Sequence, residues 1–163
     1  MESLIQNYPI VIAIIIAALI IILFYLLKRP KERYIKVDSL FTPAELKFYK
    51  ILEEVVEEYK IFGKVRVADI IKVDSEKARG NYLKYFNKIA RKHVDFLLCD
   101  PGTLEPVAAI ELDDSSHETA ERAERDVFLD KAFKMAELPL LRFKVRAKYD
   151  KIEIKKRIED ATG

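Results

Sequence analysis

An unbroken apolar run near the N-terminus constrains this chain more than any other feature. Residues 10–27 read IVIAIIIAALIIILFYLL, without one charged side chain. As a helix rising 1.5 Å per residue, the run reaches about 27 Å, close to the roughly 30 Å of a bilayer's hydrocarbon core. A core helix of a soluble protein would show a polar face. The run therefore predicts a transmembrane helix over residues 10–27.

A secretory signal peptide is the main alternative to a retained anchor. Such a peptide has a basic start, a shorter apolar region and a small-residue cleavage site. Here Glu2 lies in the start and the exit reads KRPKER, which favours a retained anchor. Basic residues gather after the run: Lys28, Arg29, Lys31 and Arg33. The positive-inside bias predicts residues 1–9 outside the cytoplasmic membrane and the following domain in the cytoplasm.

The rest of the chain is long enough for a basic juxtamembrane linker, 28–41, and one domain, 42–163. Cys99 is the only cysteine, which fits a reducing compartment better than a disulfide-bonded extracellular domain. The 29 Lys and Arg nearly balance the 27 Asp and Glu. Attraction to nucleic acid would therefore have to come from a local basic patch rather than from overall charge.

The pattern of the domain predicts an α/β fold, with a sheet between helices behind one transmembrane helix. Thr42, Pro43 and Glu45 form a capping-box start for the first helix. A DPGT turn between two apolar runs indicates an antiparallel hairpin. The expected elements are a helix at 42–59, strands at 61–71, 94–99 and 107–113, a helix at 120–137, a strand at 138–145 and a helix at 149–160.

Three carboxylates are expected on one face of the hairpin. A turn that pairs Cys99 with Val107 puts Asp95 opposite Glu111, and the two-residue strand period puts Asp113 on the same face. Like charges about 5 Å apart at their Cβ atoms are unfavourable unless they are neutralised. A divalent cation such as Mg²⁺ or Mn²⁺ would neutralise them. The alternative is that the strand ends splay and leave the acids in solvent.

Four segments of the domain carry a resemblance to a known family: HVDFLLCD, AAIELDDSSH, ERDVFLDKAF and LPLLRFKV. Together they resemble a bacterial domain-of-unknown-function family in the PD-(D/E)xK nuclease-like superfamily, related to very-short-patch-repair endonucleases. The resemblance covers Phe41 to Tyr149 and implies a restriction-endonuclease-like core of helix, three strands, helix and strand. It also implies a nuclease site in which Asp95 and Glu111 hold the metal, with the backbone carbonyl of Leu112 as a further ligand.

The sequence departs from the superfamily pattern where Asp113 replaces the lysine of E-x-K. His117 has a spacing similar to that of the assisting histidine in the short-patch-repair enzymes, and its alternative is a local hydrogen bond at a helix start. Lys131 interrupts an apolar stripe, so it either replaces the missing lysine or snorkels to solvent. Glu45 serves the capping box or the site. The candidate catalytic residues are Glu45, Asp95, Glu111, Asp113, His117 and Lys131, and the candidate metal ligands are Asp95, Glu111 and Asp113.

A basic and aromatic segment at 75–92 is a possible nucleic-acid surface. It interleaves Lys77, Arg79, Lys84, Lys88, Arg91 and Lys92 with Asn81, Tyr82, Tyr85 and Phe86. Such a mixture suits phosphates and unpaired bases. An ordinary amphipathic helix that buries its aromatic residues, or a contact with anionic lipid, accounts for the same pattern. Three charged residues of the next helix are expected on a solvated face: Arg125, Asp126 and Asp130.

These expectations combine into a membrane-anchored, divalent-metal-dependent nuclease-like domain that acts on DNA or RNA phosphodiesters. One alternative is a catalytically inactive nucleic-acid-binding or adaptor domain at the membrane. The other is a membrane-associated interaction protein whose acidic cluster binds a structural cation.

Overall fold

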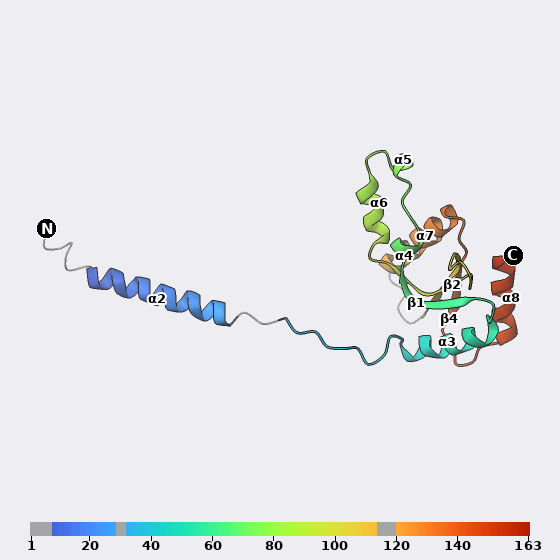
Figure 1. Ribbon diagram of the computed structural model, residues 1–163, viewed down its shortest axis with the longest axis horizontal. Coiled ribbons are helices and arrows are strands. Elements are labelled where there is room, and N and C mark those ends of the chain that lie inside the picture. Colours follow the sequence, from blue (N-terminus) through green and yellow to red (C-terminus); the bar gives the residue numbers. More distant parts are fainter. Residues whose placement is uncertain (1–7, 29–31, 114–119) are drawn as a thin grey trace. The chain divides into compact units, whose positions relative to one another are not determined.

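The computed structural model describes residues 8–28, 32–113 and 120–163 (Figure 1). The chain divides into two compact units, residues 1–38 and 39–163. The described residues form seven helices and a four-stranded sheet. The predicted mixed α/β class of the fold is therefore confirmed.

The first unit contains helix α2, Tyr8–Leu27, which begins two residues before the expected start. An 18-residue window of this 20-residue helix has a mean hydropathy of 3.5, and none of its residues is buried. At 1.5 Å per residue such a helix is about 30 Å long, the thickness of a bilayer's hydrocarbon core. By length and composition, α2 is able to cross a membrane.

The second unit begins with helix α3, Pro43–Val55, whose start forms as predicted. The Glu45 backbone N–H donates to Thr42 Oγ1 at 3.3 Å, and the Thr42 N–H donates to Glu45 Oε2 at 2.9 Å. These reciprocal bonds satisfy two donors at the helix start. The helix ends at Val55 rather than near Tyr59, because the chain turns there into the first strand at Lys60.

The sheet has the order β1, β2, β3, β4, formed by Lys60–Arg66, His93–Cys99, Pro106–Asp113 and Leu140–Lys144. The first three strands are antiparallel, and β4 runs parallel to β3. The strand expected at 61–71 is shorter in the structure. Arg66 pairs with His93, the first residue of β2, so no partner remains for a longer β1. The chain continues as a one-turn helix, α4, Val67–Ile70.

The β2–β3 hairpin has the predicted register in its central part. Phe96 pairs with Ile110, which sets Asp95 opposite Glu111. The register shifts at Leu98 and Cys99, so that Cys99 pairs with Pro106 and not with Val107 as expected. This irregularity lies beside the turn and leaves the register of the acidic end unchanged.

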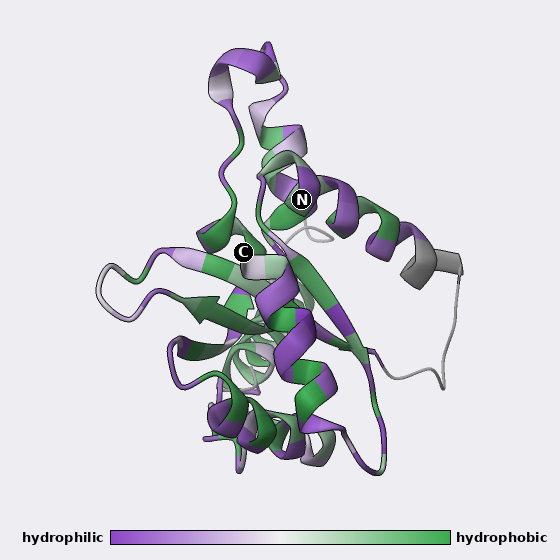
Figure 2. Cartoon of the chain, turned by 90° about the vertical axis from the view of Figure 1, so that its right-hand side faces the viewer, coloured by the Kyte–Doolittle hydropathy of each residue, from purple (hydrophilic) through white to green (hydrophobic). Residues whose placement is uncertain are grey.

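Helices cover both faces of the sheet. Phe48 and Leu52 of α3 and Ile154 of α8, Lys151–Thr162, pack on one face. On the other face, Val67 of α4 and Phe133 of α7, Ala120–Met135, belong to a second core cluster. Figure 2 shows the strands coloured largely hydrophobic, whereas the helices alternate between hydrophobic and hydrophilic residues. The sheet between helices predicted from the sequence is therefore observed.

Two short helices lie between β1 and β2 in the sequence. They are α5, Ser75–Ala78, and α6, Tyr82–Ile89. Both lie at the end of the domain opposite α3 (Figure 1). Ile89, at the end of α6, joins the second core cluster.

Candidate functional site

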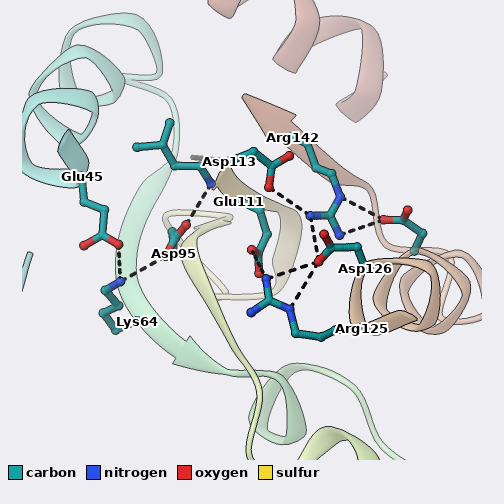
Figure 3. A network of polar contacts seen from close by, with 10 residues as sticks. Glu45, Lys64, Asp95, Glu111, Asp113, Arg125, Asp126 and Arg142 are labelled. Carbon is teal, nitrogen blue, oxygen red and sulfur yellow. Dashed lines mark hydrogen bonds and ion pairs between the residues drawn. The ribbon is translucent and has the colours of Figure 1, made fainter. Parts of the chain in front are cut away.

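A row of four charged residues crosses the sheet, one from each strand. The β1–β2 register continues to place Lys64 opposite Asp95, and the β2–β3 register places Asp95 opposite Glu111. In the parallel β3–β4 pair, Glu111 is the partner of Arg142. The row therefore has two acids in the middle and a cation at each end (Figure 3).

Asp95 lies at the point where β2 and β3 stop pairing. Its Oδ2 accepts a hydrogen bond from the backbone N–H of Leu112 at 2.8 Å, and its Oδ1 lies 3.1 Å from Lys64 Nζ. The carboxylate thus replaces a strand partner for the Leu112 N–H. Its side chain remains 19% exposed, so the group is open to a ligand.

Lys64 is held between two carboxylates. Its Nζ lies 2.5 Å from Glu45 Oε1 and 3.1 Å from Asp95 Oδ1. Burial lowers the pKa of the Lys64 ammonium, but hydrogen bonds to Glu45 and Asp95 outweigh this effect and raise that pKa above its usual value. Lys64 therefore remains positively charged at neutral pH.

Glu45 serves both purposes that the sequence left open. Its Oε2 closes the capping box, and its Oε1 contacts Lys64. Burial raises the pKa of the Glu45 carboxyl, but hydrogen bonds from Lys64 and Thr42 lower that pKa overall. The start of α3 thus fixes the position of a lysine on β1.

Glu111 is the one charged residue that is buried in the described part of the chain, with 6% of its surface exposed. Burial, followed by the charge of Asp95, raises the pKa of its carboxyl from 4.5 to about 7. Arg125 and Arg142 oppose this shift. Arg125 of α7 lies 3.9 Å from Glu111 Oε2, so this residue reaches the site instead of lying only on a solvated face.

Asp113 belongs to a different group of contacts. Arg142 lies 3.4 Å from Asp113, 3.6 Å from Asp126 and 3.1 Å from Asp130. Asp126 and Asp130, expected on a solvated face, thus join α7 to β4 through Arg142. Among residues 8–28, 32–113 and 120–163, no three His, Cys, Asp or Glu side chains are placed to hold one metal ion. The structure therefore brings Asp95 and Glu111 together and directs Asp113 toward Arg142.

A hollow of about 520 Å³ opens above these carboxylates. Its acidic lining residues are Glu45, Asp95 and Glu111. Its basic lining residues are Lys64, Arg91, Lys92, His93 and Arg125. The hollow thus combines oxygen ligands with groups that attract an anion.

Of the predicted catalytic residues that the structure describes, Asp113 and Lys131 do not line this hollow. Lys131 is exposed on α7 and is absent from the residues that line the hollow. His117 lies outside the described residues. The lysine that the structure does bring to the carboxylates is Lys64, which the sequence reasoning missed. Its only signal was Gly63, which suggested a bend in β1 and which packs against the ring of Phe41.

No curated protein and no solved structure matches the chain. A family model described as DUF2726, a protein of unknown function, matches residues 37–162. This match covers α3 to α8 and every residue of the row described above. The chain belongs to the DUF2726 family.

Proposed function

We propose that this chain is a membrane-anchored nuclease that hydrolyses DNA or RNA phosphodiesters with a divalent cation held by Asp95 and Glu111. One observation carries the proposal: the buried carboxyl of Glu111 lies beside Asp95 and has a pKa raised to about 7. A buried carboxyl with a strongly raised pKa, next to a second carboxylate in a hollow, is typical of a functional site. These are also the two residues to which the family resemblance assigns the metal.

The donor chemistry fits a hard cation such as Mg²⁺ or Mn²⁺. Both groups are carboxylates, and Mg²⁺ is commonly held by one or two protein carboxylates with water and phosphate oxygens in the other positions. A cation there would oppose both causes of the raised Glu111 pKa, which are burial of the carboxyl and repulsion from Asp95. When bound, it would supply an activated water and neutralise charge on the phosphate. Asp113, paired with Arg142, is not needed for this set.

Lys64 takes the role of the lysine that is missing from E-x-K. Because its pKa is raised, the ammonium does not remove a proton from water at neutral pH. It instead donates hydrogen bonds to a phosphoryl oxygen as negative charge develops there. Glu45 positions the ammonium, and Arg125 adds a second cation on the side of Glu111. His117 keeps the role of proton carrier as a prediction from the sequence.

Cleavage of labelled single-stranded and duplex DNA and RNA by the full chain in detergent tests the proposal. We expect products with Mg²⁺ or Mn²⁺ and none with chelator. Asp95→Asn and Glu111→Gln should abolish turnover, whereas the exposed Asp160→Asn and Glu57→Gln should leave it unchanged. Cleavage that persists in both site variants would overturn the proposal.

A non-catalytic nucleic-acid-binding domain is the second candidate, and one observation favours it. Both carboxylates already have a cationic partner within the protein, Lys64 for Asp95 and Arg125 for Glu111. Such pairs offset the negative charge of the carboxylates without any bound ion. In this case the wild-type chain binds nucleic acid, and neither cation nor chelator changes the substrate.

The cellular location is part of the same proposal. We place α2 in the cytoplasmic membrane, with residues 1–9 outside and the domain in the cytoplasm. The support is the length and apolarity of α2, together with the basic residues that follow it in the sequence.

A further inference from the structure

Helix α6 exposes large side chains that a packed amphipathic helix would bury. Tyr82 is 42% exposed, Tyr85 43% and Leu83 70%, and Ile89 is the residue of this helix that is buried. The alternative in which the aromatic residues of this segment enter the core therefore holds only in small part. The exposed side of α6 is available to a partner.

The charge of this segment is of one sign. From Arg79 to Lys92 the sequence has no Asp or Glu, and Lys84 and Lys88 are exposed on α6. The stretch ends at Arg91 and Lys92, which line the hollow together with Asp95 and Glu111. Basic residues thus follow one another along the chain from α6 to the hollow, and the charge of this basic path is complementary to a polyanion.

We propose that α6 binds single-stranded nucleic acid and guides it into the hollow, an inference that rests on the proposed nuclease function. The α6 surface consists of Tyr82, Leu83, Lys84, Tyr85 and Lys88. The rings of Tyr82 and Phe86 stack at 6.0 Å with an interplanar angle of 8°. This contact holds the Tyr82 ring in place for a base to stack on it.

A single strand fits the α6 surface better than a duplex or an anionic membrane does. The bases of a duplex are stacked inside it and do not reach tyrosine rings, whereas a single strand offers base faces and phosphates together. An anionic membrane attracts the same lysines, but it gives no account of a basic path that enters a hollow lined by carboxylates. We therefore assign the α6 surface to a single strand and treat lipid as an outcome of the test.

Fluorescence anisotropy measures the binding of a labelled single strand to the full chain in nanodiscs of neutral lipid, with chelator present. Tyr82→Ala and Tyr85→Ala should each weaken binding roughly 5- to 150-fold, while the Phe variants keep it. Lys84→Gln and Lys88→Gln should each lower the slope of log affinity against log salt by about 0.7. Matched controls are Tyr34→Ala, at 86% exposed, and the double variant Lys155→Gln, Lys156→Gln on α8.

Because the protein has no tryptophan, Tyr82→Trp supplies a single reporter on the α6 surface. We expect a single strand to quench its emission and a duplex to leave it unchanged. The surface would be reassigned to the membrane if the emission shifts to the blue in nanodiscs with anionic lipid and does not change when the oligonucleotide is added. Binding that is equal in wild type and both Ala variants would also overturn the assignment. Binding is measured with chelator and does not require turnover. A chain that binds a single strand but cleaves nothing would therefore contradict the nuclease function and not the α6 assignment.

Discussion

Glu111 is the residue whose ionisation should most affect the stability of the domain. Its pKa is about 7 in the folded protein against an ordinary 4.5, so between these values the folded state binds more protons than the unfolded state. Stability should therefore fall as the pH rises from about 4.5 to 7, by at most about 3 kcal/mol. Glu111→Gln should lose this dependence and be more stable than wild type at pH 8 in chelator.

Chemical unfolding of the full chain in detergent at several pH values measures this effect. Added Mn²⁺ should stabilise wild type at high pH and leave Glu111→Gln unchanged. The exposed Glu57→Gln is the control for the loss of one charge. A wild-type stability that rises between pH 5 and 8, relative to Glu111→Gln, would contradict the raised pKa.

Lys64 should contribute to turnover and not to metal affinity. Lys64→Gln removes a cation beside Asp95, so turnover should fall about 10²- to 10³-fold, the usual effect of a lost charge-stabilising donor. Mn²⁺ affinity should stay equal or rise, because a competing positive charge is gone. Lys60→Gln on the same strand is exposed and serves as the control. Kinetics that show a fall in Mn²⁺ affinity with unchanged turnover would reverse this role.

Local periodicity was sufficient to predict the Asp95–Glu111 pair but not the position of Lys64. Asp95 and Glu111 lie on strands joined by a short turn, so the turn and the two-residue period determine their register. Lys64 meets Asp95 through the β1–β2 pairing, which spans α4, α5 and α6. Arg125 meets Glu111 only because of how α7 docks on the sheet. Gly63 indicates a bend beside Lys64, but no local pattern pairs Lys64 with Asp95 or Arg125 with Glu111.

Strand β1 depends on a close approach that a methyl group would prevent. A Cβ atom on Gly63 would lie 2.3 Å from Phe41 Cζ, and the Phe41 ring also stacks on Tyr49 and contacts Phe96. Gly63→Ala should therefore destabilise the domain by about 1–3 kcal/mol. It should also lower turnover, because Lys64 is the next residue.

Denaturant unfolding compares Gly63→Ala with Gly102→Ala. A Cβ on Gly102 meets no atom closer than 3.4 Å, in the exposed turn between β2 and β3. We expect the second variant to unfold close to wild type. Equal stability of Gly63→Ala and wild type would show that the Phe41 ring moves aside at little cost.

The bounds of the elements show which parts of the fold have local causes. The start of α3 is determined by Thr42, Pro43 and Glu45, all neighbours in sequence, and it was predicted correctly. The end of β1 depends on where its partner β2 begins, so the β-branched run at 61–71 overstated its length. The end of a strand that depends on a partner distant in sequence cannot be predicted from one segment alone.

The proposed orientation of the chain in the membrane rests on the charges around α2. A fluorescent protein that folds only in the cytoplasm should be active when fused after Gly163, and an export-dependent phosphatase should be inactive there. Replacing Lys28, Arg29, Lys31 and Arg33 by Gln should weaken this preference, whereas Lys155→Gln and Lys156→Gln should not. Phosphatase activity with the wild-type flank would place the domain outside.

Titration of Mn²⁺ into the full chain in detergent tests the central claim most directly. At pH 8 we expect one ion per chain, with an affinity that falls about tenfold per pH unit below 7 as Glu111 takes up a proton. Asp95→Asn and Glu111→Gln should abolish binding, and Asp113→Asn should retain it because Asp113 is paired with Arg142. Wild-type binding no stronger than that of Asp95→Asn and Glu111→Gln, or binding lost only in Asp113→Asn, would contradict the assignment of the cation to Asp95 and Glu111.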